Sequence, residues 1–216
     1  MNRTGPDPLP PLPDSGPLSI VVSACLLGQP VGYDGSSWPS DLVGRIAADP
    51  RVAAHPFCPE AHTLGVPRRW MTIHDGDGFA VLERRARVIN VDGEDLSDAF
   101  IAGAEALLAL VREHDARLAI LTDISPMCGS AVIYRGEALP ERDYQASSGV
   151  AAALLRRHGI PVISQRDTAS LERLLGQLDP GFSPDPDATD FTEAPWYVQT
   201  FLEPSPPSPE PVFEDA

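Results

Sequence analysis

Short apolar runs alternate with helix-type segments along most of this 216-residue chain. The apolar runs are bounded by Gly, Pro or Asp and predict strands at 18–24, 52–57, 117–122 and 161–164. Segments with apolar residues at helical spacing, or with helix-start signals, predict helices at 39–48, 94–114, 147–158 and 168–178. A two-stranded excursion is expected at 79–91, a serine cap before the helix at 147–158, and a helix stop at Gly159. The alternation is typical of an α/β domain, and we predict three layers, α/β/α, around a mostly parallel, Rossmann-like sheet.

Proline-rich segments lie at both ends of the chain. We expect a disordered N-terminal extension at 1–17, one domain at 18–178, and a flexible, acidic, proline-rich tail at 179–216. Within the tail, the aromatic segment 191–202 has two interpretations. It packs on its own domain, or it is a docking segment for a partner or for a second copy of the chain.

The charge balance limits the partners that the chain can bind. The sequence has 31 acidic and 16 basic residues, for a formal net charge of −15, and no basic residue follows Gly176. An acidic surface repels phosphate backbones, so we expect no extended nucleic-acid partner. No apolar run approaches the ~20 residues of a membrane helix, and the N-terminus lacks the apolar stretch of a secretory signal. A cytoplasmic location is the default expectation, and the sequence does not indicate an oligomeric state.

The chain has only three cysteines, and each follows an apolar run and precedes a turn. Cys25 stands in SACLLG, Cys58 in FCPE and Cys128 in SPMCGS. In an open α/β sheet such positions lie along the carboxyl edge of the strands, where ligand crevices form. The residue types alone leave four alternatives open: three unrelated buried thiols, a metal or cluster site with three thiolate ligands, one nucleophilic cysteine, or a disulfide. The odd cysteine count argues against a disulfide framework.

The order of several motifs adds a family resemblance. Across residues 18–165 the chain reads, in sequence, SACLLGQPVGYDG, FCPE, LGVPR, VINVDGEDLSDAFIAGA, ILTDISPMCGSAVIYRG and SSGVAAALLRRHGIPVIS. Together these motifs resemble a bacterial domain-of-unknown-function family whose characterised members are 2-thiouracil desulfurases. The resemblance implies a [4Fe–4S] cluster held by Cys25, Cys58 and Cys128, with one open iron. It also implies a small-molecule substrate, a thiolated pyrimidine, whose thiocarbonyl becomes a carbonyl with release of sulfide.

The same resemblance suggests roles for residues near the cysteines. Glu60 would be the general acid and base, and Ser125 would hydrogen-bond the substrate or the attacking water. The alternatives are a carboxylate in the first turn of a helix for Glu60, and a turn serine before proline for Ser125. The expected substrate side of the pocket consists of Ser23, Tyr33, Asp34 and Arg68. For Arg68 a surface ion pair is an equal alternative.

One departure from the family pattern concerns the GYDG segment. Many members have an arginine where this chain has Gly32, and a cysteine where it has Val31. The loss of that arginine could remove a contact to a substrate carbonyl or phosphate. We therefore keep a second hypothesis, a non-catalytic protein that binds a cluster or zinc for a sensing or structural role.

Overall fold

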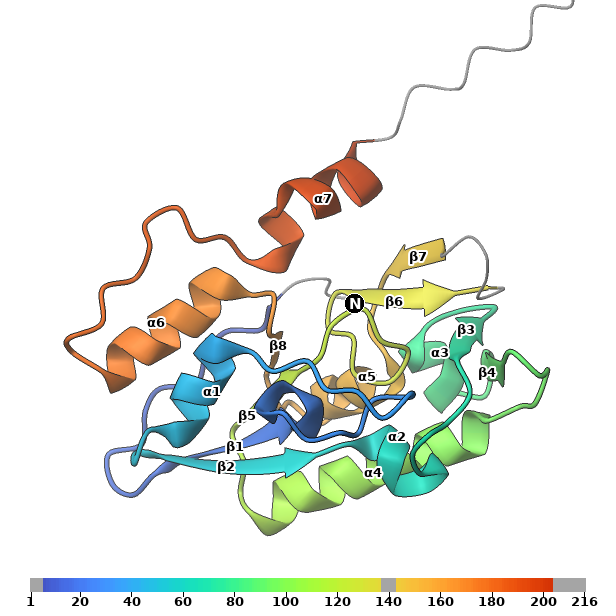
Figure 1. The fold of residues 1–216 in the computed structure, drawn as a ribbon, viewed down its shortest axis with the longest axis horizontal. Coiled ribbons are helices and arrows are strands. Elements are labelled where there is room, and N and C mark those ends of the chain that lie inside the picture. The colour runs from blue at the N-terminus through green and yellow to red at the C-terminus, as the bar shows by residue number, and fades with distance from the viewer. Residues whose placement is uncertain (1–5, 137–142, 204–216) are drawn as a thin grey trace, which may run out of the picture.

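The four strands predicted from the apolar runs of the sequence form the first of two β-sheets. A computed structural model of the protein describes residues 6–136 and 143–203 (Figure 1). Its first sheet has the strand order β2–β1–β5–β8 and is parallel throughout. The strands are β1 (Leu18–Ser23), β2 (Val52–Phe57), β5 (Leu118–Leu121) and β8 (Val162–Ser164). The prediction of an α/β domain with a mostly parallel sheet is confirmed.

Helices cover both faces of this sheet. One face packs on α1 (Asp41–Ala48) and α6 (Thr168–Leu178), and the other on α4 (Ser97–Glu113) and α5 (Val150–Arg157). Alternate residues of β1 enter the two cores, because side chains of a strand point to opposite faces in turn. Leu18, Ile20 and Val22 lie in the core with α1 and α6, whereas Val21 lies in the core with α4. The sheet and its two helical faces are the three predicted layers.

The second sheet was not expected in this form. It is mixed, with the order β4–β3–β6–β7, and is built from β3 (Met71–His74), β4 (Arg87–Asn90), β6 (Val132–Arg135) and β7 (Asp143–Ala146). The prediction of two strands at 79–91 is wrong in its first half. Gly78–Leu82 forms a short helix, α3, because the Asp77 carboxylate accepts the Ala80 N–H at 2.9 Å and caps it. Only β4 is a strand there, and it pairs antiparallel with β3.

The start of α5 differs from the prediction, and its end agrees with it. No serine caps α5: its N-cap is Gly149, which has no side chain to do so. Ser147 Oγ instead donates to Asp77 Oδ2 at 2.9 Å, and Ser148 Oγ accepts from Arg156 at 2.7 Å. Gly159 follows the helix with a φ of 72°, the left-handed conformation of a helix stop.

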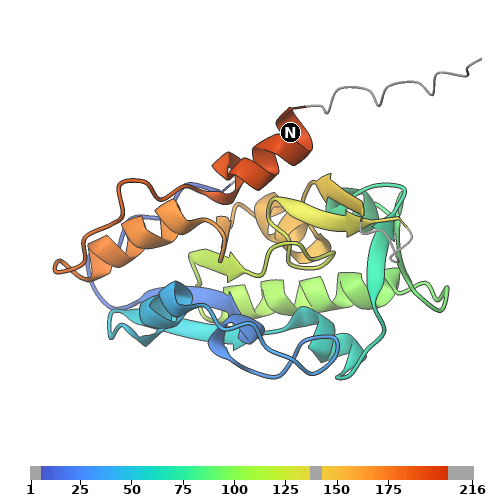
Figure 2. The same cartoon turned by 45° about the horizontal axis from the view of Figure 1, so that its top comes forward.

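Described segments near both ends of the chain pack on the domain. The prediction of a disordered segment at 1–17 does not hold for residues 6–17, because Asp7 forms a buried ion pair with Arg156, and Leu9 and Leu12 pack on the core. Residues 1–5 lie outside the described residues. Figures 1 and 2 show the segment at 191–202 beside β6 and β7, on its own domain, as the first of the two alternatives expected. Residues 204–216 of the tail are not among those described.

The segment at 191–202 contains three short helical pieces. They are η2 (Phe191–Glu193), α7 (Pro195–Tyr197) and η3 (Val198–Leu202). Phe191 and Tyr197 are buried against Ala131 and Val132. Among the described residues, none of the helices is both long enough and apolar enough to cross a membrane.

A buried carboxyl at the end of β8 makes the stability of the fold depend on pH. Asp167 accepts the N–H groups of Ser164 (2.7 Å) and Phe191 (3.1 Å). Burial nevertheless raises the pKa of Asp167 to about 6, although these two N–H donors oppose the rise. A carboxyl whose pKa is higher in the folded state stabilises the fold at low pH. That stability is fully present below the unfolded pKa and is lost as pH rises through about 6.

We expect Asp167→Asn to flatten this pH dependence. The shift corresponds to about 3 kcal/mol of unfolding free energy, because one pKa unit is worth about 1.4 kcal/mol. Urea unfolding at pH 4.5 and pH 7.5 measures the slope in the wild type and in the variant. Asp185→Asn, at an exposed turn, is the matched control and should leave the slope unchanged. Equal slopes in the wild type and Asp167→Asn would contradict the assignment.

Candidate functional site

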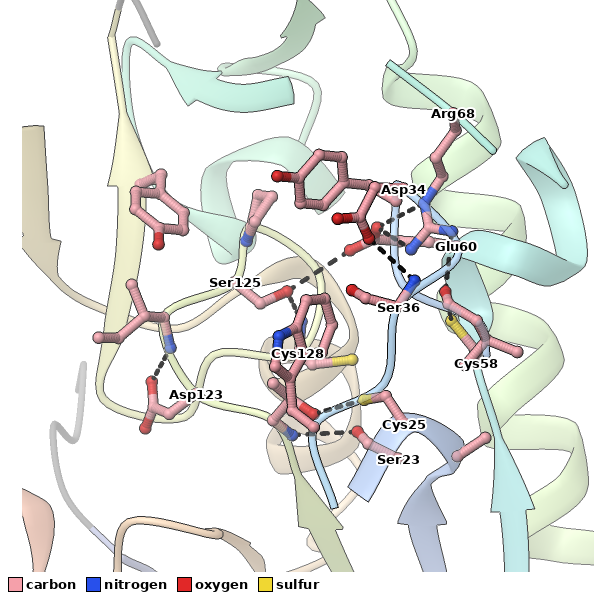
Figure 3. Close-up of a pocket in the computed structure, with 18 of the residues that line it drawn as sticks. Ser23, Cys25, Asp34, Ser36, Cys58, Glu60, Arg68, Asp123, Ser125 and Cys128 are labelled. Atoms are coloured by element: carbon pink, nitrogen blue, oxygen red, sulfur yellow. Dashed lines mark hydrogen bonds and ion pairs between the residues drawn. The ribbon is translucent and has the colours of Figure 1, made fainter. Parts of the chain in front are cut away.

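The three cysteines lie together at the carboxyl edge of the first sheet. Cys25 lies in a 3₁₀ turn, η1 (Ala24–Leu27), directly after β1; Cys58 directly follows β2; and Cys128 lies in the loop after β5. Because β2, β1 and β5 are neighbours in one parallel sheet, their carboxyl ends meet at one place. All three residues line a single cavity of about 530 Å³, and Figure 3 shows their sulfurs directed into one space.

The short helix α2 (Pro59–Leu64) sets the position of Cys58 and Glu60. Cys58 is its N-cap, and the sulfur accepts the Ala61 N–H at 3.4 Å. The start of α2 packs closely on α4, where a Cβ atom at Gly103 would lie 2.6 Å from the carbonyl oxygen of Pro59. A glycine is therefore needed at this position for α2 to approach the cavity.

The thiols are free and electrostatically coupled. Burial raises the pKa of the Cys128 thiol well above its usual value, and the Glu60 carboxylate and the other two cysteines raise it further. Burial also raises the pKa values of Cys25 and Cys58. A site that disfavours several buried negative charges gains from a bound cation, which displaces the thiol protons.

The donor set is of the kind that iron–sulfur clusters take. In the described part of the chain, no group of His, Cys, Asp and Glu side chains is arranged to hold a single metal ion. The three thiols instead surround the cavity from three different loops. Thiolate sulfurs are the usual ligands of clusters, so these residues fit such a group.

Glu60 and Arg68 form a buried ion pair beside the cavity. Nε and Nη2 of Arg68 donate to Oε2 of Glu60 at 2.9 and 2.8 Å, and both side chains are largely buried. Nη1 of Arg68 donates to the carbonyl oxygens of Val31 (3.0 Å), Gly32 (3.3 Å) and Gly65 (3.3 Å). Arg68 thus ties α2 to the loop after Cys25. This ion pair is buried, so it differs from the surface ion pair that was the alternative for Arg68. A contact of Arg68 with a substrate stays a prediction.

Removal of Arg68 should be strongly destabilising. Arg68→Ala leaves the Glu60 carboxylate and loop carbonyls without their donor, and breaking a buried pair in this way typically costs about 3–5 kcal/mol. Arg69→Ala is the neighbouring control, because Arg69 pairs with Asp92 in an exposed position and should contribute far less. Urea unfolding of the two variants makes the comparison, and similar losses in both would refute the structural role of Arg68.

The Ser125 hydroxyl lies between the Glu60 carboxylate and the backbone of Cys128. Its hydroxyl donates to Oε1 of Glu60 at 3.5 Å and accepts the N–H groups of Met127 (3.2 Å) and Cys128 (3.0 Å). One carboxylate oxygen of Glu60 therefore faces Arg68, and the other faces Ser125 and the cavity (Figure 3). A carboxylate held in this way can exchange a proton with a molecule in the cavity.

The remaining predicted residues line the same cavity with different contacts. Ser23 Oγ accepts the Thr122 N–H at 3.0 Å and so joins the ends of β1 and β5. The Tyr33 and Trp70 rings form an edge-to-face contact with their centroids 5.1 Å apart. The exposed Asp34 carboxylate accepts the Ser36 N–H. The structure thus brings all nine predicted site residues to one cavity. Their roles stay predictions.

The structure accounts for the glycine at position 32. A Cβ atom there would lie 2.7 Å from the Ser36 carbonyl oxygen and 2.8 Å from the Trp38 ring. In this chain the ring of Trp38 and the turn at Ser36 occupy the space that a side chain at position 32 would need. Trp38 itself lines the cavity.

Asp123 was not identified from the sequence, and its carboxylate holds the Cys128 loop in its conformation through hydrogen bonds. Asp123 is almost fully buried, and its Oδ1 accepts the N–H groups of Ile124 (2.7 Å) and Val132 (3.0 Å). Oδ2 accepts from Ser130 Oγ (2.8 Å) and Ala131 N (3.1 Å). The signal was an aspartate directly after a buried strand and just before the SPMC motif. The aromatic residues of the cavity were also missed, namely Trp38, Phe57, Trp70 and Tyr134.

The fold and the cavity define an α/β protein with a thiol-lined site at the carboxyl edge of a parallel sheet. The family model described as 2-thiouracil desulfurase matches residues 20–167. A solved structure of a [4Fe-4S]-dependent thiouracil desulfidase, TudS, is 38% identical, with a TM-score of 0.60, and the match covers 74% of this chain and 98% of TudS. The uncharacterised protein YbbK of Bacillus subtilis (strain 168) is 34% identical over 149 residues, which cover 68% of this chain and 96% of YbbK. The chain belongs to the 2-thiouracil desulfurase family and is a thiouracil desulfurase-like enzyme.

Proposed function

We propose that this protein converts the thiocarbonyl of a thiolated pyrimidine, a 2-thiouracil-like base or nucleoside, to a carbonyl with release of sulfide. The reaction would use a [4Fe–4S] cluster held by Cys25, Cys58 and Cys128, with one open iron. The observation that carries the proposal is the meeting of these three thiols with Glu60 and Ser125 in one cavity. The family match and the cluster-dependent relative TudS support it.

The chain's own residues supply the acid–base part of the reaction. When bound, the cluster supplies a soft Lewis acid for the thiocarbonyl sulfur. Oε1 of Glu60, on the cavity side, takes a proton from the attacking water and returns it to the departing sulfur. Water provides the new carbonyl oxygen and both protons of the hydrogen sulfide, so the conversion requires no net electron transfer.

Ser125 and Arg68 position Glu60 for this role. The Ser125 hydroxyl, fixed by the N–H groups of Met127 and Cys128, can turn its proton toward Glu60 or toward a water in the cavity. Arg68 holds the opposite carboxylate oxygen and stops the side chain from rotating. This division keeps one oxygen free for proton transfer.

The cavity wall suits a small planar substrate. Tyr33, Trp70 and Tyr134 form a row of edge-on ring contacts along one side, with centroids 5.1 and 4.7 Å apart. Aromatic walls of this kind bind the faces or edges of heterocycles. The net charge of −15 disfavours an extended nucleic-acid partner, so we propose a free small molecule in the cytoplasm as the substrate.

Anaerobic reconstitution with iron and sulfide, followed by addition of 2-thiouracil, tests the proposal. We expect sulfide and uracil to form in equal amounts. A protein that holds a cluster but turns over no thiolated pyrimidine would support the alternative, a non-catalytic cluster protein with a sensing or structural role. A protein that takes up zinc and no cluster would refute the proposed cofactor.

A further inference from the structure

The loop from Asp123 to Val132 carries both Ser125 and Cys128, and its backbone includes an unfavourable conformation. Ile124 has a φ of 57°, a left-handed conformation that is rare for a β-branched residue. Such a conformation costs free energy and persists only where surrounding contacts impose it. The Asp123 carboxylate makes the internal contacts of the loop, with donors at Ile124 and at Ser130–Val132.

A segment near the N-terminus reaches the same loop through one arginine. Asp7 Oδ2 accepts from Arg156 Nε at 2.8 Å, and the two side chains are only 12% and 8% exposed. Nη1 of Arg156 then donates to the Ser130 carbonyl oxygen at 2.6 Å. Asp7 is itself fixed to the start of β8, where its N–H donates to the Val162 carbonyl oxygen and its carboxylate accepts the Val162 N–H. A series of buried polar contacts thus connects Asp7 to Ser130 through Arg156.

The C-terminal segment covers the loop from another side. Phe191 and Tyr197 form one buried cluster with Ala131 and Val132, and Ile124 packs against it. The segment is anchored where Asp167 accepts the Phe191 N–H at 3.1 Å. Asp190 also accepts both N–H and Oγ–H of Ser170, at 2.8 Å each. Figures 1 and 2 show this C-terminal segment beside β6, the strand that leaves the loop.

Both segments lie outside the part of the chain that matches the family. The family match runs from residue 20 to residue 167, whereas Asp7 precedes it and Phe191 follows it. The structure of TudS is covered almost completely by 74% of this chain. Two segments from opposite sides of the family match therefore converge on Ser130–Val132, the residues that close the Cys128 loop.

We propose that these two segments are intramolecular braces that hold the Cys128 loop in its cluster-binding shape, with Asp7 and Phe191 as positioning residues. Ligation by a cysteine requires its sulfur to be placed accurately, and contacts behind a ligand contribute to retention of the metal. The inference rests on the cluster part of the proposed function, and it is independent of the substrate. It assigns a function to two segments that the family match leaves out.

Hydrogen exchange of the full-length, iron-free protein tests the bracing directly. We expect Asp7→Asn and Phe191→Ala each to speed exchange of the amides at 129–132 about tenfold or more, because local opening of the loop becomes easier. Asp14→Asn is the control for Asp7. Phe182→Ala is the control for Phe191. Phe182 lies under Arg45 as Phe191 lies under Arg166, but Phe182 packs on the core with α1 and α6 and not on the Cys128 loop. Loop exchange that is unchanged in both brace variants would overturn the proposal.

Cluster retention gives the second measurement. In reconstituted protein we expect Phe191→Ala to release iron to a chelator several-fold faster than the wild type, and Phe191→Leu to restore much of the retention. Leu174→Ala, in the core with α1, tests general destabilisation and should not open the loop selectively. Equal iron release by Phe191→Ala and Leu174→Ala at matched thermal stability would overturn the positioning role. If the wild type holds no cluster, the proposed function fails, while hydrogen exchange still decides whether the braces exist.

Discussion

Cys128→Ser is expected to remove nearly all iron and acid-labile sulfide from the reconstituted protein, and desulfurase activity with them. The chain has only three cysteines, so no other thiol can replace a lost ligand. Substitution of a group that only supports a metal ligand typically lowers metal affinity or activity about 10–100-fold. Loss of a ligand itself should lower them by more than about 100-fold. Iron and sulfide analysis with the visible absorbance spectrum makes the measurement.

The same loss is expected for Cys25→Ser and Cys58→Ser, which distinguishes the alternatives left open by the sequence. A single nucleophilic cysteine would make one variant inactive and leave the other two active. Thr122→Val is a useful control, because Thr122 Oγ1 contacts the Cys25 sulfur at 2.9 Å without being a proposed ligand. It should retain most of its iron. Wild-type levels of iron in any of the three cysteine variants would contradict the proposed ligand set.

Glu60→Gln is expected to lower kcat by roughly 10²–10⁴-fold while the cluster is retained, the usual range for loss of a general acid–base group. Glutamine is nearly isosteric and still presents an acceptor to Arg68, so the local fold should survive. It cannot, however, take a proton from water at Oε1. Single-turnover sulfide release, measured together with iron content, separates catalysis from cofactor binding.

A matched control and a companion variant sharpen this experiment. Glu94→Gln alters a glutamate that accepts from Asn90 Nδ2 and does not line the cavity, so activity should be unchanged. Ser125→Ala removes the hydroxyl that donates to Glu60 and accepts the Cys128 N–H, and should reduce kcat less than Glu60→Gln. Parallel loss of iron and activity in Glu60→Gln would instead indicate a structural role for the carboxylate.

Arg68 shows how a predicted residue can reach the right place with different contacts. Its position in the LGVPR motif suggested a contact with the substrate, and the structure does place it in the cavity wall. Its nitrogens, however, donate to Glu60 and to carbonyl oxygens of Val31, Gly32 and Gly65. Which acceptor an arginine finds depends on loops that meet only after folding. A local motif cannot specify it.

The sequence by itself determined the parts that depend on local pattern. The apolar runs at β1 and β5 and the helical stripe of α4 follow from side-chain periodicity, and the predicted helix at 94–114 differs from α4 by only a few residues at its start. The position of each cysteine at a strand end, with the rule that parallel strands share a carboxyl edge, predicted that the three cysteines lie along one edge of the sheet. The prediction that they form one site came from the family resemblance.

Only the tertiary structure decided the parts that depend on contacts between distant segments. The second sheet and the ion pair of Asp7 with Arg156 join residues that carry no periodic signal. Proline-rich composition predicted disorder at 1–17, yet within the described residues of that segment one aspartate and two leucines pack on the folded core. Composition reports the average cost of ordering a segment, whereas burial of a few specific groups against a surface formed elsewhere decides whether the segment is ordered.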